Sequence, residues 1–213
     1  AANSLNIYED YVRVDGMQIQ NIATAANIRG IYVGPTSVAN RIEVSNNIIA
    51  AQHSGAASGS GLLTSANNIA YVWNNIVYGF SGFGMDLENT AYAYNNTFVG
   101  NTSGLRSYTA SGTIAKNNIV KGSGNSNAYV GTFGAGTDYN ATDGTDAIGV
   151  GSNNRVSQTF YFVDEVNKDF RLAFNDAGAK NVGLDLNPDP GGYLDVTADI
   201  AGAARPDGAS TWD

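Results

Sequence analysis

Apolar and polar residues alternate through five short segments of this chain, and all five segments share one eight-residue form. The form is apolar–x–apolar–x–Asn–Asn–x–apolar, with Gly16 and Met17 in place of the Asn pair in the first copy. The five copies begin at Val12, Ile42, Ala70, Ala91 and Thr113. The four Asn pairs start 28, 21 and 22 residues apart. Alternation is typical of strands with two different faces, and a period in this range is typical of stacked repeats.

A second marker returns between these segments, a glycine that opens an apolar strand. Its four copies begin at Gly30, Gly61, Gly84 and Gly104. Two markers in a fixed order predict at least three short strands in each repeat and leave no room for a helix. We therefore predict an all-β fold in which each repeat is one coil of a parallel β-helix.

Alternation also assigns each strand residue to the inside or the outside of the coils. Residues such as Leu62 and Val72 are predicted to point inward and form the core. The outward row of the Gly strands is predicted to contain Tyr32, Leu63, Asp86 and Arg106. The outward row of the strands before the Asn pairs is predicted to contain Tyr71, Trp73, Tyr92 and Tyr94.

The Asn pairs have a structural explanation. A sharp bend between strands needs a residue that tolerates a positive φ, and Asn is the usual choice besides Gly. Stacking places Asn over Asn about 4.8 Å apart, so the amides can hydrogen-bond along the stack. We interpret the pairs as scaffold. Asn95, Asn101 and Asn140 also begin Asn-x-Ser/Thr sequons, which an Asn-rich chain contains by chance.

The pattern loosens after Lys121, and the composition changes with it. Residues 1–125 carry six acidic and six basic side chains, whereas residues 126–213 carry thirteen acidic and five basic ones. We predict a β-helix body at residues 1–130, followed at 131–213 by a Gly/Asp-rich loop and a cap that packs on the helix. The chain lacks a basic patch and an apolar run of membrane-spanning length, so we expect no nucleic-acid partner and no membrane insertion.

Residues 10–125 resemble the right-handed parallel β-helix proteins, a group that contains pectate lyases and many secreted or phage-borne proteins. The resemblance is carried by YVRVDGMQIQN at residues 11–21, by the four Asn pairs and by the Gly–apolar strands. Residues 162–173, 176–186 and 199–213 resemble a tail often found behind such helices. The resemblance implies a single-stranded, right-handed helix of about five to six coils with an irregular C-terminal cap. It also implies an extracellular location, either secreted, on a cell surface or on a virion.

The first candidate site lies on the outward face of the Gly strands. Asp86 and Glu88 are two residues apart and share a face, and Arg106 lies beside Asp86 one coil later. In pectate-lyase-like proteins, acidic residues on this strand hold Ca²⁺ against a sugar carboxylate, and a basic residue removes the C5 proton. The resemblance thus implies a catalytic group of Asp86, Glu88 and Arg106. The alternative is a cross-strand salt bridge on a solvated face. The predicted substrate-binding residues nearby are Tyr32, His53 and Tyr108.

Two further groups are candidates for binding. The outward aromatic residues Tyr71, Trp73, Tyr92 and Tyr94 would suit sugar rings, but they would equally suit cover by the C-terminal tail or contact with another subunit. Asp185, Asn187 and Asp189 have the one-three-five spacing of a calcium loop. The alternative for this second group is a simple turn, since Asp and Asn are common turn residues. We expect no required cofactor, and Ca²⁺ is the one metal that these residues suggest.

Two functions remain open. The first is an extracellular or virion-surface structural or adhesion protein that presents a face to a polysaccharide or glycan surface, or to neighbouring subunits. Self-association would then use the open end of the helix or the aromatic face. The alternative is a Ca²⁺-dependent, pectate-type polysaccharide lyase with its groove on the Gly-strand face. A β-helix fold is compatible with both.

Overall fold

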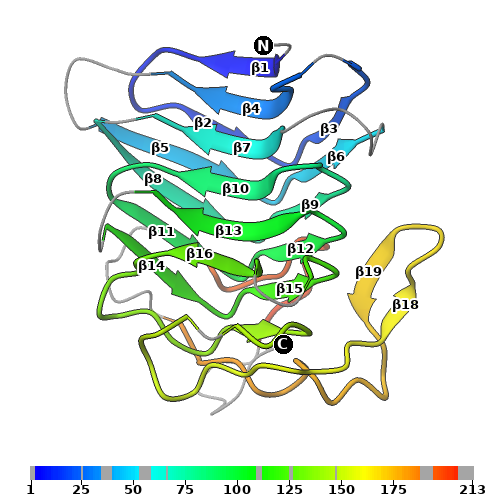
Figure 1. Ribbon diagram of the computed structural model, residues 1–213. Coiled ribbons are helices and arrows are strands. Elements are labelled where there is room, and N and C mark those ends of the chain that lie inside the picture. The colour runs from blue at the N-terminus through cyan, green and yellow to red at the C-terminus, as the bar shows by residue number, and fades with distance from the viewer. Residues whose placement is uncertain are drawn as a thin grey trace.

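The chain forms a parallel β-solenoid of about 5 turns, which confirms the predicted fold class (Figure 1). The computed structural model describes residues 3–24, 26–34, 40–52, 59–65, 67–108, 112–124, 127–146, 148–187 and 194–205. Within these ranges the protein is all-β and contains no helix. It follows that no helix in the described part of the chain could cross a membrane.

Three parallel sheets form the walls of the solenoid. Sheet A contains the Gly strands, in the order β1 (Asn3–Ile7), β4 (Arg29–Val33), β7 (Ser60–Thr64), β10 (Phe83–Leu87), β13 (Ser103–Ser107) and β16 (Tyr129–Gly131). Sheet B contains the strands before the Asn pairs, namely β2 (Arg13–Asp15), β5 (Asn40–Ser45), β8 (Asn68–Trp73), β11 (Ala91–Tyr94) and β14 (Thr113–Lys116). Sheet C contains the strands after the pairs, namely β3 (Gln18–Asn21), β6 (Ile48–Ala51), β9 (Ile76–Tyr78), β12 (Thr97–Val99), β15 (Ile119–Lys121) and β17 (Ala141–Thr142).

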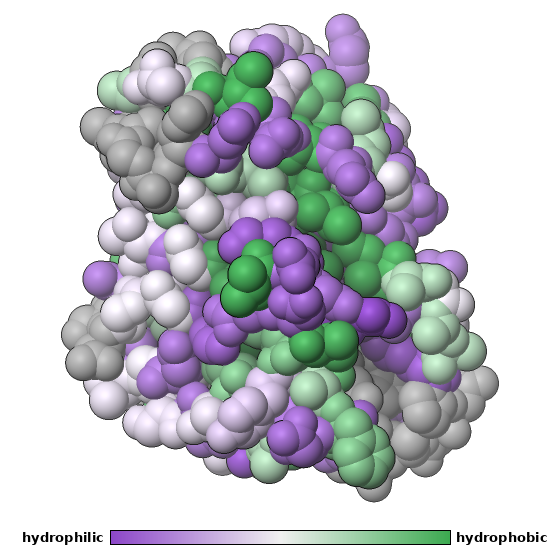
Figure 2. Space-filling view, turned by 90° about the vertical axis from the view of Figure 1, so that its right-hand side faces the viewer, coloured by the Kyte–Doolittle hydropathy of each residue, from purple (hydrophilic) through white to green (hydrophobic). Residues whose placement is uncertain are grey.

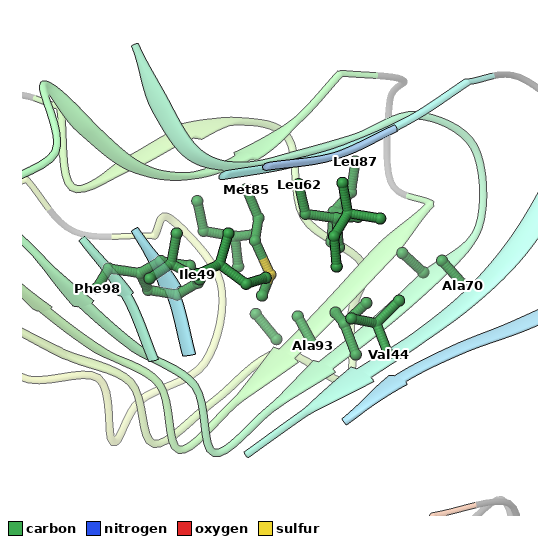
Figure 3. Packing of buried hydrophobic residues seen from close by; sticks show 14 of the residues in the cluster. Val44, Ile49, Leu62, Ala70, Met85, Leu87, Ala93 and Phe98 are labelled. Carbon is green, nitrogen blue, oxygen red and sulfur yellow. The ribbon is translucent and has the colours of Figure 1, made fainter. Parts of the chain in front are cut away.

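The register between coils agrees with the faces predicted from alternation. Met85 is paired with Leu62 in the preceding coil and with Leu105 in the following one, and all three side chains are fully buried. Figure 3 shows such side chains pointing toward one another from the three sheets, for example Val44 from sheet B and Phe98 from sheet C. The core is therefore a continuous apolar column along the solenoid axis.

The second Asn of each pair forms a buried ladder along the corner between sheets B and C. Each side-chain amide donates to the Oδ1 atom one coil later, at 2.8–3.0 Å. The ladder runs through Asn47, Asn75, Asn96, Asn118, Asn140 and Asn154. The first Asn of each pair makes the bend, with φ near 55° at Asn74, Asn95 and Asn117. The predicted stacking of amides is thus confirmed for the second Asn of the pair.

The stacking continues beyond residue 130, where the sequence had suggested the end of the body. Asn140 and Asn154 extend the ladder, and Thr113 and Lys116 form parallel bridges with Phe133 and Asp138. The Asn-Asn pattern is hidden in the sequence because Tyr139 replaces the first Asn of the pair. Its φ of 59° is nevertheless close to the 55° of Asn117. The residues just after β16 therefore complete a further, less regular coil.

The glycines of the second marker allow close stacking of the coils. A Cβ atom on Gly84 would lie 2.7 Å from the carbonyl oxygen of Gly104, and one on Gly104 would lie 2.5 Å from that of Ala128. Gly30 and Gly61 face the next coil in the same way, each at 2.6 Å. Because real Cβ atoms do not come so close to a backbone oxygen, these positions require glycine.

The C-terminal part folds back over two outer faces of the solenoid. A hairpin of β18 (Phe162–Asp164) and β19 (Asp169–Leu172) packs on sheet C, where Phe170 lies 5.2 Å from the ring of Tyr78. Figure 2 looks onto this side of the molecule and shows a band of hydrophobic residues beside the projecting hairpin. Residues 184–187 and 194–205 then cover part of the outer face of sheet B and the Asn corner.

Candidate functional site

The structure brings Asp86 and Arg106 together as a bidentate ion pair on the outer face of sheet A. They occupy paired positions on β10 and β13. Nε of Arg106 donates to Oδ1 of Asp86 at 2.6 Å, and Nη2 donates to Oδ2. The side chain of Asp86 is only 3% exposed and that of Arg106 is 26% exposed. Two parallel charge-assisted bonds of this kind fix both side chains in one geometry.

Neighbouring side chains enclose the pair. The guanidinium of Arg106 lies over the ring of Phe83 at 4.0 Å and over the ring of Tyr108 at 4.8 Å. Leu63 precedes Asp86 in the outward row, and Val130 follows Arg106. A calcium ligand must present oxygen to the ion, and a base must present a free lone pair to the proton. In this arrangement both carboxylate oxygens of Asp86 and the guanidinium of Arg106 are directed at each other.

Of the other residues predicted on this face, Tyr108 contacts the pair, whereas Glu88 and Tyr32 lie at other positions along the sheet. Glu88 lies one residue beyond β10, where its backbone N–H donates to Oγ1 of Thr64 at 3.0 Å. Tyr32 lies further along the outward row, paired with Leu63, and the guanidinium of Arg29 lies over its ring at 4.7 Å. Tyr108 is 60% exposed and contacts the pair through Arg106. His53 lies outside the described residues.

The aromatic group on sheet B lies beneath the C-terminal tail. Trp73 is 1% exposed, and its Nε1 donates to the carbonyl oxygen of Asp195 at 3.0 Å. Tyr71 and Tyr92 stack with nearly parallel rings at 5.0 Å, and Tyr94 is buried beside them. The tail residues packed on this group are Leu184, Leu186, Leu194 and Val196. The chain's own tail therefore occupies the face on which we had considered an open sugar-binding surface.

The predicted calcium loop contains a turn. The backbone N–H of Asn187 donates to Oδ1 of Asp185 at 2.8 Å, which is the hydrogen bond of an Asx-turn. Asp189 lies outside the described residues. Across the described ranges, no group of three or more His, Cys, Asp or Glu side chains is arranged to hold a metal ion.

The structure also contains a cavity that sequence reasoning missed. It has a volume of about 350 Å³ and lies between the corner after sheet B, the β19 strand and the end of the tail. Its polar lining includes Asn74, Asn95, Asn117, Arg171, Asp199 and Arg205. The only sequence signal for this site is the first Asn of each pair, whose positive φ explains the backbone but leaves the side-chain amide without an assigned role.

The stacked sheets and the Asn ladder define the chain as a parallel β-solenoid repeat protein. No protein-family model matches it, and no match was found among the curated proteins or the solved structures. The fold class therefore rests on the geometry of the chain, and its function must come from individual sites and surfaces.

Proposed function

We propose that this protein is a non-catalytic, structural β-solenoid of an extracellular or virion surface, and that it joins a neighbouring subunit through its N-terminal end. One observation supports this most directly. In the described part of the chain, β1, β2 and β3 are the edge strands of sheets A, B and C, and all three belong to the first coil (Figure 1). A row of unpaired edges on every wall is a template for a further β-coil.

Exposed apolar side chains at the same end support this proposal. They are Tyr8, Tyr11, Met17 and Ile22, which are 59%, 78%, 45% and 64% exposed. Large apolar side chains that gather in one exposed region are more typical of interaction sites than of free surface, and all four belong to the first coil. Both ends contribute to the buried core, the first coil through Ile7, Val14 and Ile19 and the last through Tyr129, Phe133 and Ile148. The exposed side chains and the unpaired strand edges of the first coil are therefore what suit the N-terminal end to assembly.

The Asp86–Arg106 pair does not favour the polysaccharide lyase. Each member neutralises the other at 2.6 Å, and Asp86 is almost inaccessible. Side chains at paired positions of adjacent strands commonly form ion pairs on the outer face of a sheet. The Asp86–Arg106 contact is therefore sufficiently explained as a structural cross-strand ion pair.

Self-association measured by sedimentation over a wide range of protein concentration tests the assembly proposal. We expect concentration-dependent association, and we expect Ile22→Lys to weaken it at least about tenfold by placing a charge at the open end. Val166→Lys is the matched control, because Val166 is 85% exposed but lies in the hairpin turn. A protein that stays monomeric at all concentrations would contradict the proposal.

A second measurement addresses the absence of catalysis. The protein is incubated with polyuronates at mildly alkaline pH, with and without Ca²⁺, and absorbance from unsaturated sugar ends is followed. We expect no increase over the buffer. A Ca²⁺-dependent increase that disappears in Arg106→Ala would replace the structural proposal with the lyase.

A further inference from the structure

The first Asn of each pair begins an outer ladder at the corner between sheets B and C, and the C-terminal tail interrupts it. Nδ2 of Asn74 donates to Oδ1 of Asn46 at 3.1 Å. If the repeat continued, Asn95 would donate to Asn74 and would accept from Asn117. The three residues have the same φ of 55°, so their backbones would allow this arrangement.

The tail instead binds both neighbours of Asn95. Nη2 of Arg205 donates to Oδ1 of Asn74 at 3.1 Å. Nδ2 of Asn117 donates to the carbonyl oxygen of Leu184, and the N–H of Leu184 donates back to Oδ1 of Asn117, each at 2.8 Å. The amides above and below Asn95 are therefore directed toward the tail.

Asn95 is left with an unsatisfied amide. Both Oδ1 and Nδ2 of Asn95 are buried, and neither has a hydrogen-bond partner among the described residues. Leaving a buried donor or acceptor unpaired costs about 1–3 kcal/mol for each group. A molecule that offers one donor and one acceptor side by side would satisfy both atoms.

The surroundings of Asn95 have the size and composition of a small-molecule site. Asn95 lines the cavity of about 350 Å³, in which apolar side chains such as Ile76, Ile119 and Phe170 alternate with polar ones. Its volume is within the range of ligand pockets, which begins at about 300 Å³. Nine of its sixteen lining residues are polar and five of these are Asn, so the cavity suits a ligand that carries several hydrogen-bonding groups. Arg171, which is 68% exposed, also lines the cavity and marks its opening to solvent.

The charges in the cavity argue against a small anion as the ligand. The acidic residue Asp199 is part of the lining, and its Oδ1 accepts from the backbone N–H groups of Ala201 and Ala203. Nη1 of Arg205 donates to the carbonyl oxygen of Val196 at 3.1 Å and also to that of Ala198, so this cation is held by the tail itself. Arg171 is bonded to Asp169 through Nε at 2.8 Å. A neutral ligand fits this balance best.

We propose that the cavity binds one neutral sugar unit through the amide of Asn95. Because both amide atoms are closed to solvent in this structure, the Asn95 side chain must turn toward the cavity on binding. One hydroxyl of a vicinal pair then donates to Oδ1, and its neighbour accepts from Nδ2. The C–H face of the sugar ring packs on the apolar wall that Phe170 lines, since aromatic and aliphatic side chains suit such faces. The site is separate from the N-terminal edge strands, so this inference does not depend on the proposed assembly.

Nuclear magnetic resonance of the full chain tests the proposal. The side-chain NH₂ signal of Asn95 is assigned by its loss in Asn95→Gly, a change that suits the positive φ. D-glucose, D-galactose, D-mannose and N-acetyl-D-glucosamine are the probes. We expect at least one of them to shift this signal saturably, and we expect Asn95→Gly to weaken its binding at least about tenfold, as loss of two hydrogen bonds requires.

The controls separate the site from the ladder as a whole. Asn46→Gly makes the same change at a φ of 56° in the same ladder, but Asn46 is not part of the cavity lining, so binding should be unchanged. Ile200→Trp keeps Asn95 and fills the cavity, and it should abolish binding even if Asn95→Gly fails to fold. If none of the four sugars shifts the side-chain NH₂ signal of Asn95, the proposal is overturned. Equal sugar binding by Ile200→Trp would also overturn it.

Discussion

The backbone and the side-chain N–H groups of Asn75 both donate to one oxygen atom of Asn96. The side-chain Nδ2 and the backbone N–H of Asn75 each donate to Oδ1 of Asn96 at 3.0 Å, and both residues are fully buried. The same contact returns in every coil from Asn47 to Asn154. Each coil therefore supplies the hydrogen-bond acceptor for the buried N–H groups at the corner of the preceding coil.

We predict that Asn96→Ala destabilises the protein by at least about 2 kcal/mol. The change removes the partner of the Asn75 N–H and the side-chain donor to the carbonyl oxygen of Val72, and each such buried group costs about 1–3 kcal/mol. Oδ1 of Asn118 loses one of its two donors but keeps the backbone N–H of residue 96. Urea unfolding measures the difference. Asn167→Ala, at an exposed turn where Asn167 bonds Asp164, is the control and should cost at most about 1 kcal/mol. Similar losses for the two variants would contradict a special role for the ladder.

Gly84→Ala should destabilise the protein by about 1–3 kcal/mol or more, because the new methyl group would lie 2.7 Å from the carbonyl oxygen of Gly104. Gly136→Ala is the matched control. Its φ is not positive and its new methyl group would lie 3.5 Å from Ile114, an ordinary contact distance. Thermal unfolding of both variants checks the prediction, which fails if Gly84→Ala unfolds at the wild-type temperature.

If the Asp86–Arg106 pair is structural, the two charges should be strongly coupled. Arg106→Gln leaves a carboxylate that is 3% exposed without its partner, and we expect a loss of about 2 kcal/mol or more, below the full value for a buried pair because Arg106 is partly exposed. Adding Asp86→Asn removes the orphaned charge and should restore part of the stability. A double-mutant cycle measures the coupling. Additive effects would mean that the two side chains do not depend on each other.

Docking of the tail on sheet B can be tested at Leu186, which is 1% exposed and packs in the cluster with Trp73. We predict that Leu186→Ala costs about 2–5 kcal/mol, the usual range for a buried Leu. Val163→Ala, at a residue 53% exposed in the hairpin, should change stability by less than about 0.5 kcal/mol. Equal stability of Leu186→Ala and wild type in urea would show that the tail contributes little.

Acid should weaken the coil that contains Asp138. Burial raises the pKa of Asp138, but hydrogen bonds from the side chain and backbone of Asn153 and from the backbone of Tyr139 and Ser152 outweigh it, so the pKa lies below its ordinary value. A lowered carboxyl pKa contributes stability to the fold at pH values above the ordinary pKa of about 4. This contribution is lost as the pH falls through the folded-state pKa. Other aspartates contribute similarly, so the comparison must be with a variant. Asp138→Asn should show a flatter loss of stability between about pH 5 and pH 2 in urea unfolding, and an identical profile would contradict the prediction.

The local pattern of the sequence is sufficient for the solenoid walls but not for the tail. Alternation places Leu62 inside and Asp86 outside because every coil repeats the same short strand, and the parallel register preserves those positions. The tail has no such repeat. Its contact with Trp73 joins residues 122 positions apart, and no periodicity relates them. The sequence could therefore suggest that the C-terminal tail packs on the aromatic group, but it could not separate this from sugar binding or contact with another subunit.

The candidate sites show the same division. The pairing of Asp86 with Arg106 follows from register, whereas the enclosure of Arg106 between Phe83 and Tyr108 depends on side-chain directions that spacing does not reveal. Asn95 belongs to the same Asn-Asn motif and has the same φ of 55° as Asn74 and Asn117. Only the path of the tail, which binds Asn74 and Asn117, sets its amide apart.

The path of the tail also bears on how the molecule folds. In the described strands, the sheet ladders join each coil to the coils directly before and after it. Stacked repeats of this kind can open and close one unit at a time. The tail crosses that order, because Leu184 is bonded to Asn117 and Arg205 is bonded to Asn74, residues 67 and 131 positions earlier in the chain. It can dock only after those coils have stacked. Its docking is thus expected to be a late step that converts a one-dimensional series of coils into a single cooperative unit.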